Sequence, residues 1–232
     1  AGLGLSGFAA ADTLIELGAE VVVADDKDSP ENQQKADTLK IVGAADVVLG
    51  EGAMDSLPMV GGKTPDVVIT SPGLRPTLGI LADAVAQRVQ IWGDVELAWR
   101  LNSRAGRKTP QWLCITGTNG KTTTVGMVES MLQAAGKKAI AVGNVGTPIL
   151  DALRDPVEYD FLAVELSSFQ LHWTHSMSPL ASVVLNVAED HVDWHEGYTN
   201  YLADKARIFE HVQKACVFNC LLYTSDAADE RS

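Results

Sequence analysis

The chain has 232 residues, 46% of them hydrophobic, which is enough for one or two domains with a substantial core. Its net charge of −12 argues against nucleic acid or an anionic membrane surface as a partner. No apolar run approaches the roughly 20 residues of a membrane-spanning helix. The three cysteines, Cys114, Cys216 and Cys220, lack metal-ligand spacing and are expected to be reduced thiols, so a cytoplasmic location is predicted.

Apolar runs alternate with amphipathic segments along the chain. The pattern predicts strands at residues 20–24, 46–49, 66–70, 112–116, 138–142, 160–165, 181–187 and 215–219. It predicts helices at residues 7–17, 31–42, 77–88, 94–102, 121–135 and 198–211. Runs rich in Val, Ile and Ala are typical of strands buried on both faces of a parallel sheet. The alternation therefore indicates a doubly wound α/β fold.

The segment from Ser103 to Pro110 is polar, basic and rich in helix breakers, and is interpreted as a linker. It divides the chain into a Rossmann-like domain, residues 1–106, and an incomplete P-loop α/β domain, residues 109–219. The chain opens where a first strand is expected to have passed. Residues 220–232 fit no further strand–helix unit and are interpreted as a non-native tail.

A glycine-rich turn opens the first domain. Gly2-Leu3-Gly4-Leu5-Ser6-Gly7 precedes a predicted helix and then a strand that ends at Asp25-Asp26. This pattern suits NAD, with Asp25 on a ribose hydroxyl, but it suits other nucleotide diphosphates equally well. Ser71-Pro72-Gly73 follows another strand, where such sheets bind ligands, although an ordinary turn explains these residues too.

A second glycine-rich loop lies between a predicted strand and a long predicted helix. It comprises Gly117, Thr118, Asn119, Gly120, Lys121, Thr122 and Thr123. Loop N–H groups, the helix N-terminus and the Lys121 ammonium all favour a phosphate, and the Thr122 hydroxyl can ligate magnesium. Ile115 stands where the usual P-loop has its first glycine, so the motif is a shortened variant. The alternative is a helix start with an incidental lysine.

Four polar residues that follow the loop in the sequence are candidates for the same site. Asn144 and Glu165 come at or after strand ends, His191 follows the strand at 181–187, and Lys205 lies in the helix at 198–211. Parallel strands deliver such residues to one sheet edge, where a carboxylate and an imidazole can ligate magnesium beside ATP. Each of these residues could instead be an ordinary residue of the solvated surface. For Lys205, considered by itself, an exposed position is favoured. The remaining histidines, His172, His175, His195 and His211, are interpreted as structural or surface residues.

Together these motifs resemble the Mur ligase family of bacterial cell-wall synthesis. Residues 117–122 are similar to the family's ATP loop. Glu165-Leu166-Ser167-Ser168-Phe169-Gln170-Leu171, residues 186–193 and residues 93–96 resemble the member that joins D-glutamate to UDP-N-acetylmuramoyl-L-alanine. The resemblance implies an ATP-dependent, amide-forming acid–amino-acid ligase. ATP would phosphorylate the substrate carboxylate, and the amine of D-glutamate would attack the acyl phosphate.

The resemblance also implies residue roles. Lys121, Glu165, His191 and Lys205 would be catalytic, and residues 117–123 would bind ATP. Two Mg²⁺ ions are expected, held by Thr122, Glu165, His191 and a carbamylated Lys205. The residues expected to bind UDP-N-acetylmuramoyl-L-alanine, in place of NAD, are Leu5, Ser6, Asp25, Asp26, Ser71, Gly73 and Asn144. Lys27 stands where relatives often carry Arg.

The resemblance covers residues 1 to about 219, roughly the first half of a family protein. The chain itself is therefore expected to be a catalytically incompetent N-terminal fragment, and the enzyme a cytoplasmic monomer. The alternatives are another Mur ligase, a folylpolyglutamate synthetase-like ligase, an NAD-dependent oxidoreductase fused to a P-loop kinase, and a non-catalytic nucleotide-sugar-binding module. The residues that follow Glu165 argue against the first two.

Overall fold

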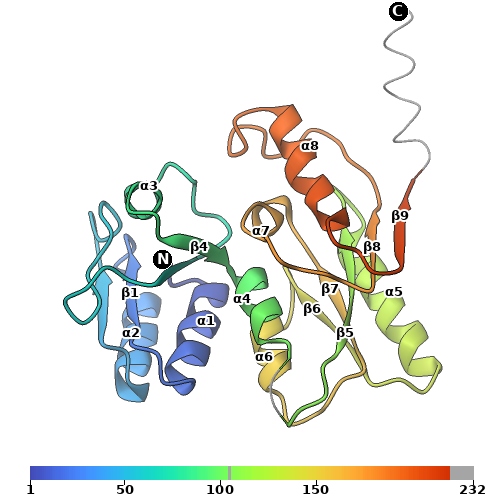
Figure 1. Cartoon of the computed structure of the whole chain (residues 1–232), viewed down its shortest axis with the longest axis horizontal. Helices are drawn as coiled ribbons and strands as arrows, with labels where there is room; N and C mark the ends of the chain where they lie inside the picture. The colour runs from blue at the N-terminus through green and yellow to red at the C-terminus, as the bar shows by residue number, and fades with distance from the viewer. Residues whose placement is uncertain (104–105, 220–232) are drawn as a thin grey trace, which may run out of the picture. The chain divides into compact units, whose positions relative to one another are not determined.

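The computed structural model describes residues 1–103 and 106–219 (Figure 1). The expected tail, residues 220–232, and two residues of the expected linker lie outside the described residues. The chain divides into two compact units, Ala1–Leu97 and Ala98–Ser232, and each is described here by itself. No helix among the described residues combines the length and the apolar character needed to cross a membrane.

The first unit alternates helices with parallel strands. Its elements are α1 (Leu5–Glu16), β1 (Val22–Asp25), α2 (Pro30–Val42), β2 (Asp46–Leu49), β3 (Val67–Thr70), α3 (Gly79–Ala86) and β4 (Gln90–Gly93). Strands β1 and β2 pair in parallel, as do β3 and β4. Helices α1 and α2 bury Ala11, Ala36 and Leu39 in one cluster with Val23 of β1 and Val47 of β2.

The first residues of the chain lie between the two strand pairs. The Ala1 nitrogen donates to the Ile69 carbonyl at 2.6 Å, and the Ser71 N–H donates to the Ala1 carbonyl at 2.9 Å. On the other side, the Gly2 N–H donates to the Ala24 carbonyl at 2.8 Å. Ala1 and Gly2 therefore link β3 to β1, which places the glycine-rich turn at the edge where both strands end.

Helix α2 shows why these helices form where they do. The Ser29 hydroxyl caps its N-terminus by accepting from the Asn32 N–H at 3.2 Å, and Pro30 occupies the first turn, where its missing N–H is harmless. Gly43 ends the helix with φ +113°, a left-handed conformation that favours glycine.

The second unit contains a five-stranded parallel sheet with the order β6-β7-β5-β8-β9. Its strands are β5 (Gln111–Thr116), β6 (Ala139–Gly143), β7 (Phe161–Glu165), β8 (Ala181–Val184) and β9 (Ala215–Phe218). The helices are α4 (Asp94–Leu101), which overlaps the boundary between the units, α5 (Lys121–Ala134), α6 (Ile149–Arg154), α7 (Ser168–His172), α8 (Tyr198–Ala206) and a 3-10 turn, η1 (Arg207–Phe209). Figure 1 shows α7 and α8 close to each other above the sheet.

The expected α/β fold with parallel sheets is confirmed, and the differences concern short elements. Three elements, β4, α6 and α7, were not predicted from the sequence, and each has six residues or fewer. Periodicity is weak over such lengths; α7 instead depends on a capping box between Ser167 and Gln170. The helix expected at residues 198–211 is wrong at its end, because α8 stops at Ala206 and tightens into η1. The helix expected at 77–88 is shorter, Gly79–Ala86.

Candidate functional site

The loop between β5 and α5 is held in shape by its backbone. Gly120 has φ +84° at the N-cap of α5, and a Cβ on Gly117 would lie 3.1 Å from the Leu185 Cβ. Asn186, just after β8, fastens the loop: its Oδ1 accepts from the Asn119 N–H at 2.9 Å, and its Nδ2 donates to the Asn119 carbonyl at 3.0 Å. The expected phosphate loop thus follows a buried strand and opens a helix of 14 residues.

The Lys121 side chain folds back over this loop. Its ammonium donates to the carbonyls of Gly117 and Thr118, both at 3.0 Å. Helix α5 has no side-chain cap and no acidic residue in its first turn, so its N-terminal N–H groups and positive dipole end are not neutralised there. The loop therefore combines a full positive charge with backbone donors, which is the chemistry of an anion site.

Glu165 joins three elements at the edge of the sheet. Its Oε2 accepts from the Thr122 hydroxyl at 2.8 Å, and its Oε1 accepts from the Asn144 side-chain amide at 3.0 Å. The residue is 2% exposed, and β6 and β7 are in register where Gly143 faces it. A Cβ on Gly143 would lie only 2.2 Å from the Glu165 carbonyl oxygen. The structure thus brings together three of the residues singled out from the sequence.

This group of oxygen atoms suits a hard divalent cation. Each carboxylate oxygen of Glu165 accepts one hydrogen bond in the structure and has a further lone pair, and the Thr122 hydroxyl lies beside it. Magnesium prefers carboxylate, hydroxyl and water oxygens and shares them with substrate phosphates. The residues present therefore fit the ion expected from the sequence.

Lys205 is buried, whereas its helix considered alone favoured an exposed position. It is 3% exposed, and its ammonium lies 5.0 Å from the centre of the Tyr201 ring. Burial and the positive charge of Lys121 lower the pKa of Lys205 from 10.5 to about 8, although Asp190 opposes the shift. The amine is therefore far easier to obtain uncharged than that of a surface lysine.

His191 lies at the surface of the same unit. Its side chain is 53% exposed, and its Nε2 is 3.5 Å from Asp190 Oδ2. The ring packs at 4.8 Å from that of Phe169, and the backbone has φ +52°. Among the described residues, the His191 side chain has a polar contact with Asp190 and no hydrogen bond to Glu165 or Thr122.

The glycine-rich turn of the first unit is tightly packed. A Cβ on Gly7 would lie 2.0 Å from the Gly2 carbonyl oxygen, and one on Gly2 would lie 2.5 Å from Ser71 Oγ. That hydroxyl is buried, and among the described residues it has no hydrogen-bond partner. Leu5, 64% exposed, and Ser6, half-buried, begin α1 directly above the turn.

The two aspartates after β1 bind backbone groups. Asp25 accepts from the Leu3 N–H at 2.6 Å and from the Lys27 N–H at 2.8 Å, so it braces the glycine-rich turn itself. Asp26 accepts from the Met54 N–H at 3.0 Å. Gly73 lies exposed in the turn after β3.

Several contacts of this region were not predicted from the sequence. Thr118 was expected only as a loop residue that binds ATP, but its hydroxyl also lies 3.0 Å from the Tyr201 hydroxyl and accepts from the Ala188 N–H at 2.9 Å, so it links the loop to α8. Asn186 was not expected to be a site residue, because the strand predicted at 181–187 contained it, whereas β8 ends at Val184. His172, His195 and Asp204 form a further cluster that no sequence pattern indicated.

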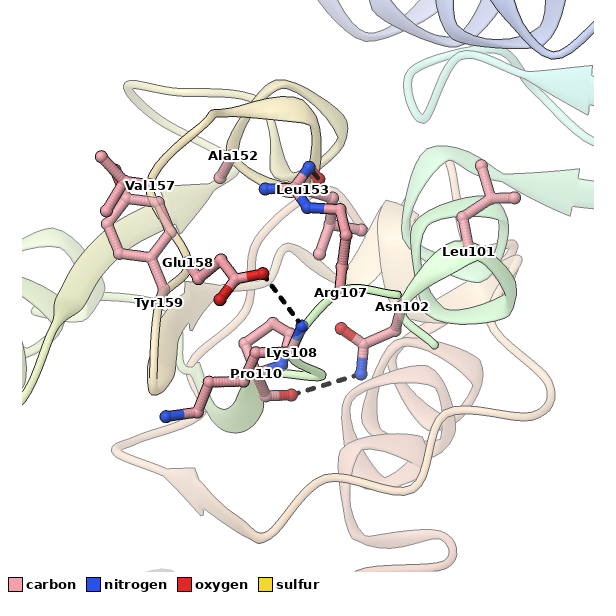
Figure 2. A pocket seen from close by; sticks show the side chains of 10 residues that line it. All are labelled: Leu101, Asn102, Arg107, Lys108, Pro110, Ala152, Leu153, Val157, Glu158 and Tyr159. Carbon is pink, nitrogen blue, oxygen red and sulfur yellow. Dashed lines mark hydrogen bonds between the residues drawn. The ribbon is translucent and has the colours of Figure 1, made fainter. Parts of the chain in front are cut away.

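A small hollow lies at the opposite end of β5 (Figure 2). The Arg107 guanidinium donates to the carbonyls of Leu153, at 2.8 Å, and Asp155. Asn102 donates to the Pro110 carbonyl at 3.3 Å. Parallel sheets bind ligands beyond the carboxyl ends of their strands, and this hollow is at an amino end. Its polar groups are therefore interpreted as anchoring the chain that enters the sheet.

Comparison with known proteins places this geometry in a family. Residues 115–228 match the Mur ligase middle domain, and the chain belongs to the Mur ligase family. More particularly, it is 49% identical over 219 residues to the UDP-N-acetylmuramoylalanine–D-glutamate ligase of Streptomyces coelicolor, a match that covers 94% of this chain and 45% of that protein. The enzyme of the same name from Thermobifida fusca is 50% identical over 90% of this chain and 43% of its own. The chain thus spans about half the length of these relatives.

Solved structures support the same fold. The chain is similar to UDP-N-acetylmuramate:L-alanyl-gamma-D-glutamyl-meso-diaminopimelate ligase from Neisseria meningitides, with a TM-score of 0.56 and 18% identity over 99% of this chain and 72% of that one. It is also similar to UDP-N-acetylmuramoyl-L-alanyl-D-glutamate–2,6-diaminopimelate ligase, with a TM-score of 0.52 and 20% identity over 90% of this chain and 44% of that one. At such low identity these likenesses concern the fold alone.

Proposed function

We propose that this chain is part of an ATP-dependent ligase that joins D-glutamate to UDP-N-acetylmuramoyl-L-alanine during peptidoglycan precursor synthesis. The observation that carries the proposal is the contact of Glu165 with both Thr122 and Asn144 beside the Lys121 loop. It provides a phosphate site and a cation site at one sheet edge. The similarity to D-glutamate ligases at about half of all positions supports the choice of substrates.

The loop residues from Gly117 to Thr123 would hold the ATP phosphates. Lys121 would leave the carbonyls of Gly117 and Thr118 and pair with the terminal phosphates, since a phosphate oxygen is a stronger partner than a peptide carbonyl. Thr122 and Glu165 would hold one Mg²⁺, and His191 and Lys205 would contribute to a second. Bound Mg²⁺ supplies charge neutralisation for the phosphates.

The reaction needs an activated carboxyl group. A carboxylate oxygen of the substrate would attack the γ-phosphorus of ATP, the bond to the bridging oxygen would break, and ADP would leave. The amine of D-glutamate would then attack the acyl carbon, lose a proton and expel phosphate, which leaves an amide. The protein's contribution is positioning and charge stabilisation, with Asn144 near the reacting carboxyl group.

Lys205 would act as a carbamate. Carbamylation requires an uncharged amine, and the burial that lowers the pKa of Lys205 to about 8 makes this form accessible near neutral pH. The ammonium first loses one proton, and addition of carbon dioxide to the uncharged amine nitrogen then releases a second proton, so that a buried cation becomes an anionic oxygen ligand. Such a group is compatible with a site that already contains the positive charge of Lys121.

The first unit would bind the UDP-sugar and not NAD. Helix α1 begins at Leu5 and Ser6 with no side-chain cap and no acidic residue in its first turn, and the buried Ser71 hydroxyl lies against Gly2 of the same turn. Asp25 and Asp26 would shape this site, because their oxygens already accept from backbone N–H groups. Gly73 would allow close approach of the ligand after β3.

Because the chain spans about half of its relatives, we expect it to bind these ligands and not to catalyse the reaction. The full-length enzyme is proposed to act as a cytoplasmic monomer. Calorimetric titration of the chain with UDP-N-acetylmuramoyl-L-alanine, with NADH and with ATP plus Mg²⁺ tests the binding part. Binding of NADH without a response to the UDP-sugar would refute the proposal. Phosphate release by the full-length enzyme, dependent on both substrates, tests the reaction.

A further inference from the structure

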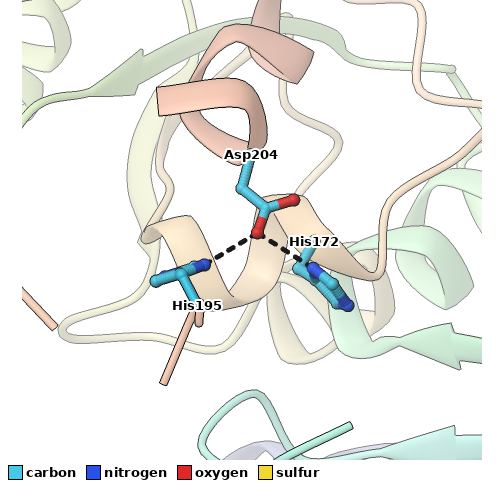
Figure 3. A group of neighbouring side chains, drawn as sticks. All are labelled: His172, His195 and Asp204. Carbon is cyan, nitrogen blue, oxygen red and sulfur yellow. Dashed lines mark hydrogen bonds and ion pairs between the residues drawn. The ribbon is translucent and has the colours of Figure 1, made fainter. Parts of the chain in front are cut away.

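Two histidines and an aspartate meet beneath α8, as Figure 3 shows. One oxygen of Asp204, Oδ2, lies 2.9 Å from His172 Nδ1 and 2.7 Å from His195 Nδ1. The other ring nitrogen of His195 is 3.0 Å from the Ser168 hydroxyl. The His195 side chain is fully buried, that of Asp204 is 11% exposed and that of His172 is 30% exposed.

The distances identify the contacts as hydrogen bonds. Two ligands of a tetrahedral Zn²⁺, each about 2.0 Å from the ion, are about 3.3 Å apart, and both contacts of Asp204 Oδ2 are shorter. Each ring therefore donates its Nδ1–H to the carboxylate, and His195 Nε2 accepts from the Ser168 hydroxyl. Burial lowers the pKa of His195, which favours this neutral form; burial alone would raise the pKa of Asp204, but the hydrogen bonds from the two histidines lower it.

The cluster and the Ser168 hydroxyl bonded to it are close in sequence to residues of the proposed magnesium site. Ser168 and His172 follow Glu165 by three and seven positions, His195 follows His191 by four, and Asp204 directly precedes Lys205. The cluster thus connects three segments that meet only in the folded chain. Since successive residues of a helix project about 100° apart, fixing Asp204 on one side of α8 fixes the direction of Lys205.

An aromatic ring extends the connection to His191. Phe169 stacks on His195, with ring centres 5.5 Å apart and planes 3° apart, and it also lies 4.8 Å from the His191 ring. A shift of His195 would therefore displace the surface on which His191 packs. The position of the exposed His191 ring therefore depends on that of the buried His195 ring.

We propose that His172, His195 and Asp204 are positioning residues that hold Lys205 and His191 in register with Glu165. The proposal rests on the proposed function, in which these three residues contribute to the magnesium sites. It assigns no contact with substrate to the cluster. Its effect is on the geometry of the metal-binding residues and hence on the Mg²⁺ concentration that the enzyme needs.

The test uses the full-length ligase that contains residues 1–219, with the variants Asp204→Asn and His195→Gln. His211→Asn is the control, because His211 is exposed and asparagine tolerates its left-handed backbone, φ +57°. We expect the Mg²⁺ concentration for half-maximal phosphate release to rise about tenfold or more in both variants, the scale of losing a charge-assisted hydrogen bond. The KM for UDP-N-acetylmuramoyl-L-alanine is expected to stay within about twofold, since the cluster is assigned no contact with this substrate.

Melting temperatures distinguish a positioning role of the cluster from a purely structural role. A variant that melts earlier but keeps the Mg²⁺ dependence of the parent would overturn the proposal. If Asp204→Asn does not fold, His172→Gln is the milder substitution, because His172 is partly exposed. Stoichiometric Zn²⁺ binding by the parent, lost in His195→Gln, would replace the positioning role with a metal site. An inactive parent enzyme would instead refute the proposed function.

Discussion

Replacing the buried Lys205 with methionine is expected to stabilise the chain at neutral pH. The pKa of this lysine falls from 10.5 to about 8 because it is buried and faces the charge of Lys121. One pKa unit corresponds to about 1.4 kcal/mol, so a shift of 10.5 − 8, about 2.5 units, amounts to about 3 kcal/mol. Below pH 8 both states are protonated and the folded state bears the whole penalty. Between pH 8 and 10.5 the unfolded state binds more protons, so stability rises with pH.

Urea unfolding of the chain at several pH values, in carbonate-free buffer, measures this effect. Lys205→Met is expected to be about 3 kcal/mol more stable than the parent at pH 7, an advantage that disappears by about pH 10.5. Lys214→Met, at an exposed lysine of the same unit, is the control and should stay within about 0.5 kcal/mol. Equal stability of Lys205→Met and the parent at pH 7, or the same pH slope for both above pH 8, would refute the reasoning.

Three further substitutions test the sheet edge and the loop. Gly143→Ala is expected to destabilise the chain by about 2–4 kcal/mol in urea unfolding. The reason is that a Cβ would lie 2.2 Å from the Glu165 carbonyl oxygen and that φ is +118°. An unchanged urea midpoint would contradict this close approach of Gly143 to Glu165. Glu165→Gln can still accept from the Asn144 amide and can donate its own N–H to the Thr122 hydroxyl, so it should cost within about 1 kcal/mol. Phosphate release by the full-length enzyme should nevertheless fall about 100-fold or more, and normal turnover would exclude a metal role. Lys121→Ala should abolish phosphate release with little change in melting temperature, and near-normal turnover would remove the lysine from the mechanism.

The sequence predicted those parts of the site that follow strands. Glu165 and Asn144 could be placed near the loop because parallel strands end at a common edge, and the structure connects them within 3.0 Å. The burial of Lys205 could not be derived from its helix alone. A lysine in an amphipathic helix is usually exposed, and only tertiary packing decides that α8 buries Lys205 together with Tyr201 and Asp204.

The histidine cluster shows the limit of sequence reasoning. His172 and His195 are 23 positions apart in the sequence, and neither has the spacing of a known ligand pair. They meet because α7 and α8 pack together and because Asp204 projects from the buried face of α8. Such contacts depend on tertiary packing, for which a single sequence contains no periodic signal. The short helix α7 was missed for a related reason, since its stability comes from a capping box.

The position of Ala1 and Gly2 between β1 and β3 has a consequence for the order of folding. The pairs β1–β2 and β3–β4 each join segments that are near in sequence, whereas Ala1 must reach Ile69 across 68 positions. Loop closure of that length is entropically unfavourable and slows assembly. The two strand pairs can therefore form early and independently, and insertion of the glycine-rich segment between them is expected to be the late, rate-limiting event of the first unit. The glycine-rich turn would then reach its final conformation last.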